Sequence, residues 1–263
     1  MHESSPQRRQ TIMELSLKGK IVLITGASRG IGAAIAAALA YHGATVVINF
    51  LNSREKAEEL LNTIEKNGGN GSIAQADVRD RDQVNRMVDT AIKQYGKVDA
   101  LVNNANINFA VKPFTELSWE DIEAKVNGEL KALYNCTQVV LKDMVKRKKG
   151  KLILISSGLS RRPGYGFSAH AAAKSAVDGL AKVMALELGM HGITVNVVGP
   201  GLTMTDAIAR QPDEMLKRSA DANPLKRIGK PEDIAGAVVF LVSSLSDYIT
   251  GEYIPVNGGS FMI

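Results

Sequence analysis

The sequence predicts an α/β fold in one domain, a doubly wound parallel sheet of about seven strands with helices on both faces. The first observation is that short, β-branched apolar runs alternate with helical stretches from Lys20 onward. The second is that six of these runs are almost continuously apolar, as expected for parallel strands covered on both faces. This alternation predicts right-handed crossovers. No repeat or change of composition divides residues 18–263, so we expect a single domain there.

The expected strands are rich in Val, Ile and Leu, and they occupy residues 21–25, 44–50, 72–78, 100–105, 151–157, 193–199 and 252–259. Segments with helical periodicity fill the intervals, such as REKAEELLNTIEKNG after the second strand. That helix is expected to begin after Ser53, which can cap its N-terminus, and to end near Gly68 and Gly69.

Two segments do not fit the alternation. Residues 1–17 are polar and have no apolar run after their two adjacent arginines, so we expect a flexible N-terminal extension rather than a signal peptide. Residues 202–224 read LTMTDAIARQPDEMLKRSADANP, a polar and partly helical stretch. A connection of this length is more often a substrate loop or lid than a surface insertion.

The composition excludes several classes of function. The chain has 263 residues and a formal net charge of +5, which is mild. Its densest basic run, KRKKGK at 146–151, has no interleaved aromatic residues, so we expect a solvated turn and no nucleic-acid partner. The single cysteine, Cys136, excludes an internal disulfide and a multi-cysteine metal site, and no metal is expected. No apolar run reaches the roughly 18 residues of a membrane span, so we expect a cytoplasmic protein without a membrane partner.

A glycine-rich loop follows the first expected strand directly and opens the next helix. It reads Thr25-Gly26-Ala27-Ser28-Arg29-Gly30-Ile31-Gly32. Glycines permit a tight turn and close approach of the backbone to a pyrophosphate, and the helix N-terminus presents free N–H groups to the anion. A short glycine pattern is weak evidence alone, but its place between a first strand and a first helix predicts a Rossmann-like dinucleotide site.

The residues after the second strand favour NADP(H) over NAD(H). An NAD site of this fold usually has an acidic residue there for the ribose hydroxyls. This chain instead has Asn52, Ser53 and Arg54, with no carboxylate to repel a phosphate. Arg54 and Arg29 could pair with a 2′-phosphate, since a guanidinium suits that geometry. Arg54 could alternatively be an ordinary charge at a helix start.

From Leu17 to the C-terminus, the motifs resemble those of the short-chain dehydrogenase/reductase family, in its 3-oxoacyl-carrier-protein reductase-like branch. They are, in chain order, TGASRGIG, Asp77-Val78, Asn103-Asn104-Ala105-Asn106, Asn127, Ser157, Lys174, Pro200-Gly201, LKRIGKPED at 225–233 and DYITGEYIPVNGG at 247–259. Two of them depart from the family pattern, because Asn106 replaces a Gly and Asn257 replaces a usual Asp.

The resemblance implies roles for individual residues. The catalytic set would be Asn127, Ser157 and Lys174, with His170 standing where the family has its proton-donating Tyr. Beyond the glycine loop, the implied cofactor contacts are Asp77, Val78, Asn104, Ala105, Lys174, Pro200, Gly201, Thr203 and Thr205. The spacing of thirteen residues from Ser157 to His170 is the one the family shows.

His170 and Lys174 would share one face of a helix, and the pair could be either catalytic or an ordinary part of that face. A nearby ammonium should lower the pKa of His170 and leave its ring neutral at pH 7. Neutral imidazole donates a hydrogen bond but is a weak acid. Tyr165 could supply a phenol instead, although it lacks the fixed helical relation to Lys174.

Three functions remain open from the residues. The first is an NADPH-dependent carbonyl reductase that uses His170 as donor or oxyanion partner. The second is reduction of a protonated C=N bond, which needs no strong acid. The third is a non-redox or non-catalytic protein of the same fold, such as a cyclase, a dehydratase or a binding partner.

The expected substrate is a small or mid-sized, largely apolar molecule. The pocket would lie between residues 106–114, 158–167 and 202–224, which supply Phe109, Phe114, Phe167, Met204 and Met215. The resemblance also implies self-association as a homotetramer or dimer, through the Ala-rich helix after His170 and the last strand, EYIPV.

Overall fold

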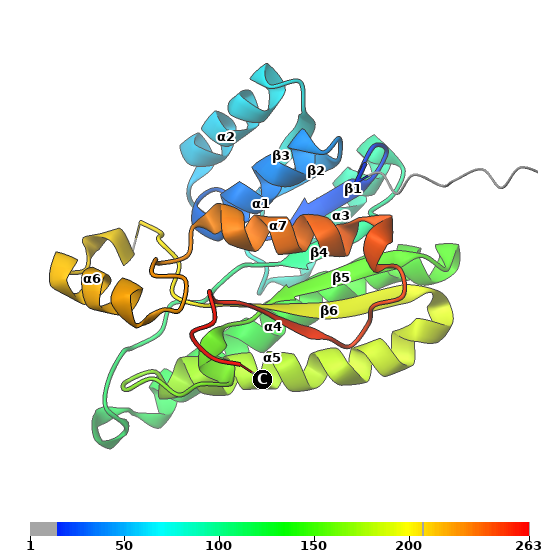
Figure 1. The fold of residues 1–263 in the computed structure, drawn as a ribbon. Helices are drawn as coiled ribbons and strands as arrows, with labels where there is room; N and C mark the ends of the chain where they lie inside the picture. Colours follow the sequence, from blue (N-terminus) through cyan, green and yellow to red (C-terminus); the bar gives the residue numbers. More distant parts are fainter. Residues whose placement is uncertain (1–14, 207, 263) are drawn as a thin grey trace, which may run out of the picture.

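A computed structural model describes residues 15–206 and 208–262. It contains a seven-stranded sheet in the order β3-β2-β1-β4-β5-β6-β7, with every neighbouring pair parallel, which confirms the predicted fold class (Figure 1). The strands are β1 Ile21–Ile24, β2 Thr45–Phe50, β3 Asn70–Gln75, β4 Ala100–Asn103, β5 Gly150–Ile155, β6 Ile193–Pro200 and β7 Tyr253–Val256.

The strand order reverses at β1, which pairs with β2 on one side and β4 on the other. Val22 lies opposite Val46 of β2 and Ala100 of β4. In open α/β sheets, ligands bind beyond the carboxyl ends of the strands at this switch point. The loops that follow β1 and β4 therefore define where the site is expected.

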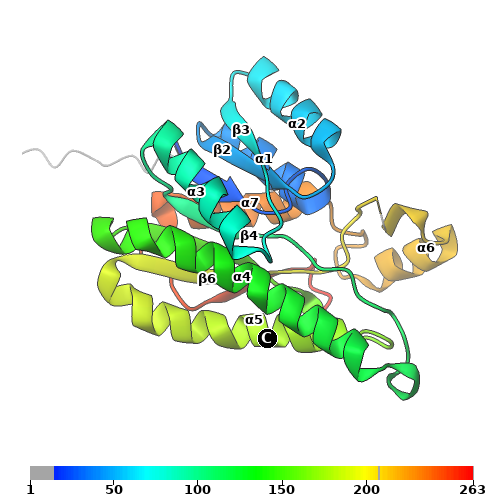
Figure 2. The same cartoon turned by 180° about the vertical axis from the view of Figure 1, so that it is seen from behind.

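Helices cover both faces of the sheet (Figures 1 and 2). They are α1 Gly30–Tyr41, α2 Arg54–Lys66, α3 Arg81–Tyr95, α4 Trp119–Arg147, α5 Ser168–Leu188, α6 Asp213–Ala222 and α7 Pro231–Val242. Local signals account for several starts. Asp80 accepts hydrogen bonds from the amides of Asp82 and Gln83 at the start of α3, and Ser118 and Asp121 form a capping box at the start of α4.

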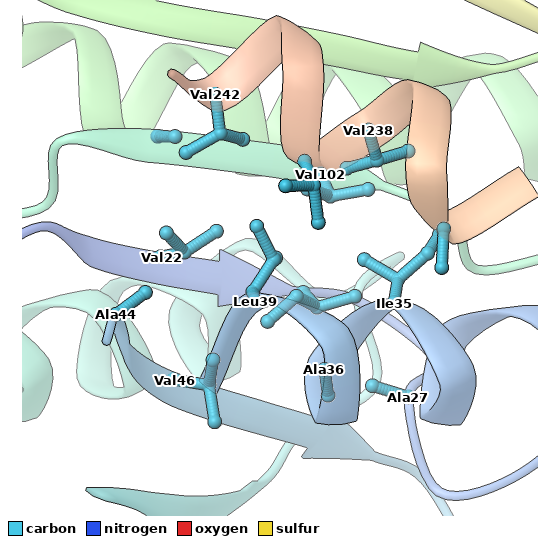
Figure 3. Close-up of a cluster of buried hydrophobic side chains, with 14 of the residues drawn as sticks. Val22, Ala27, Ile35, Ala36, Leu39, Ala44, Val46, Val102, Val238 and Val242 are labelled. Atoms are coloured by element: carbon cyan, nitrogen blue, oxygen red, sulfur yellow. The ribbon is translucent and has the colours of Figure 1, made fainter. Parts of the chain in front are cut away.

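Two apolar cores lie on the two faces. The first joins α1, α2 and α7 to the sheet, and Figure 3 shows Ile35 and Leu39 of α1 between Val22 and Val46 of the strands and Val238 of α7. The second joins α3, α4 and α5 to the opposite face. Because both faces are covered, every residue of β1 and β5 is buried.

The structure adds detail to two expectations, the N-terminal extension and the long connection at 202–224. Residues 1–14 of the expected extension lie outside the described residues, whereas Leu17 is buried and donates its amide to the carbonyl of His42. The expected loop at 202–224 contains a short 3-10 helix, Ile208–Arg210, and α6. Helix α6 stands away from the sheet and has no buried residue (Figures 1 and 2).

Within the described part of the chain, no helix is long and apolar enough to cross a membrane. The basic run at 146–151 forms the turn between α4 and β5, where Lys148 adopts a positive φ of 51°.

Candidate active site

The glycine loop packs so closely that two of its glycines cannot be replaced without movement. A Cβ on Gly26, whose φ is +61°, would lie 2.9 Å from the Cα of Ala105. A Cβ on Gly32 would lie 2.5 Å from Nδ2 of Asn104 and 2.7 Å from the carbonyl oxygen of Gly26. The loop after β4 therefore presses against the loop after β1, as a dinucleotide fold requires.

Side-chain hydrogen bonds hold this loop in place. The hydroxyl oxygen of Thr25 accepts from the amides of Asn104 (3.0 Å) and Ala105 (2.9 Å), and the amide group of Asn104 donates to the carbonyls of Thr25 and Gly26. Buried Asn49 accepts from the Gly26 amide at 3.1 Å. Asn104 and Ala105 thus shape the cradle, and Asn49, which the sequence did not single out, supports it from β2.

The cradle fits a diphosphate. Helix α1 begins at Gly30, and its N-cap residue, Arg29, makes no side-chain cap hydrogen bond, so the first-turn N–H groups face outward without a capping acceptor. Strand β6 ends at Pro200, and the loop that begins at Gly201 returns over this helix start. A Cβ on Gly30 would lie 3.6 Å from Cγ2 of Thr205. Thr203 is buried instead, and its hydroxyl donates to the carbonyl of Gly201.

Three basic side chains lie on the loop after β1 and on the first turn of α2. Arg54 donates to Glu58 and Gln75, each at 3.3 Å, and lies over the ring of Phe50. Lys56 of α2 pairs with Asp206 of the loop after β6 at 3.4 Å. Arg29 is exposed, and none of the side-chain hydrogen bonds of the described residues uses its guanidinium. Asn52 and Ser53 lie on the connection between β2 and α2.

The proposed adenine-contacting pair follows β3. The carboxylate of Asp77 accepts from Arg79, with an N–O distance of 2.7 Å, and this hydrogen bond holds the pKa of Asp77 below its usual value. Val78 is buried, and its carbonyl accepts from Asn135.

Ser157, His170 and Lys174 converge at the carboxyl end of β5. Ser157 is the second residue after this strand and accepts a hydrogen bond from the Leu159 amide. Lys174 is buried, and its ammonium donates to the carbonyl of Ile155 at 2.8 Å. His170 lies one turn earlier on the same face of α5. The structure therefore brings three of the four expected catalytic residues to one place.

His170 is only 8% exposed and stacks on Phe109, with ring centroids 4.5 Å apart. Its Nδ1 is buried and has no hydrogen-bond partner in the described structure. Burial, and then the ammonium groups of Lys174 and Lys125, lower the pKa of His170 to about 3. The imidazole is therefore neutral at pH 7, as the sequence predicted.

Asn127 does not join this group, which corrects the sequence-based assignment. Its side chain is exposed, and its amide donates to Glu123 at 3.4 Å on the outer side of α4. The residue of α4 that faces the site is Glu129, two positions further on. A two-residue shift turns a helix by about 200°, so the two side chains lie on nearly opposite faces.

Glu129 and Lys125 are site residues that the sequence analysis missed. The carboxylate of Glu129 accepts from Lys174 at 2.5 Å and from Lys125 at 2.6 Å. Burial acts to raise the pKa of Glu129, but the two ammonium groups outweigh it and hold the pKa below its ordinary value. The sequence did contain a signal for these two residues, because Lys125 and Glu129 form an i, i+4 pair of opposite charge on either side of the assigned Asn127.

The expected substrate pocket is only partly assembled. Phe109 and Phe167 lie together, with ring centroids 6.0 Å apart, beside His170. Phe114 and Met215 are exposed and do not line a closed pocket. Tyr165 is 85% exposed, so its phenol points to solvent rather than toward Lys174. Among residues 15–206 and 208–262, no three His, Cys, Asp or Glu side chains gather to hold a metal ion.

A dinucleotide cradle at the switch point, with Ser157 and Lys174 beside it, defines a class of nucleotide-dependent α/β oxidoreductases. Residues 26–260 match the family model described as enoyl-(acyl carrier protein) reductase. The chain belongs to the short-chain dehydrogenase/reductase family.

Relatives and solved structures agree with this assignment. The chain is 39% identical to the 3-oxoacyl-[acyl-carrier-protein] reductase FabG of Staphylococcus epidermidis over 246 residues, which cover 92% of this chain and 99% of that one. It is 36% identical to the FabG of Thermotoga maritima over 245 residues, which cover 93% of this chain and 99% of that one.

Two solved structures illustrate the range of substrates on this fold. A 7α-hydroxysteroid dehydrogenase with NADH and 7-oxoglycochenodeoxycholic acid is 32% identical, with a TM-score of 0.88 over 93% of this chain and 95% of that one. A gluconate 5-dehydrogenase from Burkholderia cenocepacia with NADP and tartrate is 33% identical. Its TM-score is 0.87, and the match covers 94% of this chain and 97% of that one. The chain is therefore a nicotinamide-dependent oxidoreductase of the same family.

Proposed function

We propose that this protein is an NADP(H)-dependent reductase of a carbonyl group in a small or mid-sized, largely apolar molecule. The observation that carries the proposal is the convergence of Ser157, His170 and Lys174 at the carboxyl end of β5, beside the glycine loop. FabG relatives are named as reductases of 3-oxoacyl groups, and one structural neighbour is complexed with NADP.

Particular residues would hold each part of the cofactor. The glycine loop and the start of α1 would hold the diphosphate, and Arg29 and Arg54 the 2′-phosphate. Asp77 and Val78 would face the adenine, and Thr205 the nicotinamide side. When bound, NADPH supplies hydride.

The chain's own groups would orient and polarise the substrate. The hydroxyl of Ser157 would donate a hydrogen bond to the carbonyl oxygen. His170 would offer a neutral N–H to the oxygen as negative charge develops there, and the ammonium of Lys174 would add favourable electrostatics. A neutral imidazole does not readily surrender this proton, so water would supply the proton that completes the alcohol.

Reduction of a protonated C=N bond is a second candidate, favoured by the neutral state of His170. An iminium carbon accepts hydride without a proton donor, and an uncharged imidazole repels the cation less than an imidazolium would. The His170 pKa of about 3 therefore supports this substrate class as well.

One experiment separates these functions. Wild type, His170→Tyr and His170→Phe are assayed with NADPH against ketones and cyclic iminium ions, and loss of the nicotinamide absorbance is followed. For a carbonyl reductase, His170→Tyr should maintain or raise ketone turnover. For an iminium reductase the Tyr variant should be impaired and the Phe variant tolerated. Full ketone activity in His170→Phe would exclude a role for His170.

The proposal extends to assembly and location. Helix α5 exposes Val183 and Leu186, the 3-10 helix Gly189–His191 after it exposes Met190, and β7 is one edge strand of the sheet. These surfaces suit closed two-fold contacts in a homotetramer located in the cytoplasm. The proposed partners are a small-molecule substrate and other copies of the chain.

A further inference from the structure

Lys125 is a fully buried lysine at the edge of the site, with 0% of its side chain exposed. Its ammonium donates to Oδ1 of Asn106 (2.7 Å), to the carbonyl of Ile107 (2.8 Å) and to Oε2 of Glu129 (2.6 Å). All three of its N–H groups are therefore used by the protein, and none is left for a substrate. A buried charge of this kind is costly unless it is fully paired, so its role must lie in what it holds.

The first thing that Lys125 holds is the carboxylate of Glu129. One oxygen of this carboxylate, Oε2, accepts from Lys125 and from the Ile107 amide, and the other, Oε1, accepts from Lys174. Lys174 also donates to Ile155, which leaves one of its three N–H groups free. Glu129 thus fixes both the position and the counter-charge of the Lys174 ammonium.

The second thing that Lys125 holds is the segment that supports His170. It bonds Asn106 and Ile107, and its ammonium lies 5.1 Å from the ring centroid of Phe109. Phe109 in turn stacks on His170. One buried lysine is therefore connected to both site residues of α5.

We propose that Lys125 and Glu129 are positioning residues that act as one ion-paired unit, fixing Lys174 through the carboxylate and His170 through Phe109. The proposal rests on the proposed function, because it concerns how the same site holds its cofactor and substrate groups. Lys125 and Glu129 do not touch the substrate in this arrangement.

The charged groups around Lys174 show what the loss of Glu129 would change. Glu129 and Lys125 face it from α4, His170 and Asp178 lie one turn away on either side along α5, and Arg161 pairs with Asp178. Glu129 is the carboxylate that contacts the Lys174 ammonium directly. Without it, the ammonium would keep only its hydrogen bond to the Ile155 carbonyl, so its position beside the cofactor would be less fixed. The affinity for NADPH should then fall.

The decisive variant is the double substitution Lys125→Met with Glu129→Gln. It removes one positive and one negative charge together, so no new net charge is buried and the fold should persist. NADPH affinity is measured by fluorescence titration at pH 7. We expect the double variant to bind NADPH about tenfold more weakly than wild type, which is the size of one charged hydrogen bond.

The matched control is Glu123→Gln with Lys142→Met, which makes the same charge change on the exposed side of α4. The control should bind NADPH with the wild-type affinity. A double variant that also binds NADPH with the wild-type affinity would overturn the proposal, because Lys125 and Glu129 would then be merely structural.

A second readout needs no cofactor. Histidine NMR of Lys125→Met should show a higher pKa for His170, because the ammonium of Lys125 is one of the groups that lower it. It should also show a second ring environment once Phe109 loses its support. An unchanged His170 titration and signal would contradict the proposal. A wild-type protein that fails to bind NADPH would contradict the proposed function alone, since this NMR test would still stand.

Discussion

The carboxylate of Glu129 and the ammonium of Lys174 form a hydrogen-bonded ion pair 2.5 Å long between residues 45 positions apart. The pair joins the middle of α4 to the first turns of α5, and both side chains are buried. It identifies the face of α4 that enters the site. It also places a negative charge beside the cation that the proposed mechanism uses for the cofactor.

Glu129→Gln alone should destabilise the protein strongly. The substitution leaves the ammonium groups of Lys125 and Lys174 buried without their shared counter-charge, and breaking a buried pair from one side costs about 3–5 kcal/mol. Denaturant titration measures this loss in the free energy of unfolding. The exposed control Glu123→Gln should change it by less than about 0.5 kcal/mol, and an equal effect of the two substitutions would refute the ion-pair interpretation.

His170 should make the protein less stable as the pH falls. The folded-state pKa of about 3 lies below the ordinary value near ~6.5, so the unfolded chain takes up the proton first. Relative to His170→Gln, wild type should lose about 2 kcal/mol of unfolding free energy between about pH 7.5 and pH 5. Parallel stability profiles of the two proteins would show that the histidine is not buried in its neutral form.

Arg29→Ala should remove most of the preference for NADPH over NADH. Arg29 has an unengaged guanidinium beside the glycine loop, and a charged hydrogen bond to a phosphate contributes about 1.5–3 kcal/mol. Arg54→Ala should have a smaller effect, because Arg54 already donates to Glu58 and Gln75. Equal affinity of the wild-type protein for the two cofactors, measured by titration calorimetry, would contradict the NADP assignment.

Light scattering should report a homotetramer of about 113 kDa, four times the 28.2 kDa chain. Leu186→Glu should reduce this mass, since Leu186 is an exposed apolar residue of α5 and a charge is costly to bury in an interface. Lys182→Glu changes the charge on the same helix at an already polar position. It tests whether a change of charge alone, without loss of an apolar side chain, reduces the mass. A single-chain mass at micromolar concentration would exclude the tetramer.

The sheet and the cofactor loop could be predicted because their determinants are local. Strands such as Ile21–Ile24 and Gly150–Ile155 are buried on both faces, so their sequences are continuously apolar. The glycine loop needs Gly26 and Gly32 for steric reasons that hold wherever this turn meets a diphosphate. The neutral state of His170 was expected from its neighbour Lys174, one helical turn away, although burial is the larger cause of its low pKa.

The α4 side of the site could not be predicted in the same way. Asn127 and Glu129 are both polar and two positions apart, and only the packing of α4 against α5 decides which one turns inward. The burial of Lys125 depends on the loop after β4, which brings Asn106 and Ile107 to its ammonium. Phe109 reaches His170 across 61 residues of sequence by the same loop. Apart from the i, i+4 charge pair of Lys125 and Glu129, these are tertiary relationships with no local pattern.

The most direct measurement follows the nicotinamide absorbance of NADPH with a panel of ketones, for the wild-type protein and for Lys174→Ala. We predict substrate-dependent loss of the absorbance with wild type and a severe reduction with Lys174→Ala, provided circular dichroism shows both proteins folded. Exposed Lys142 of α4, changed to Ala, serves as the matched control and should retain turnover. An unchanged rate in Lys174→Ala would contradict the proposed site, and wild-type protein that binds NADPH but oxidises it with no carbonyl or iminium compound would contradict the reductase function.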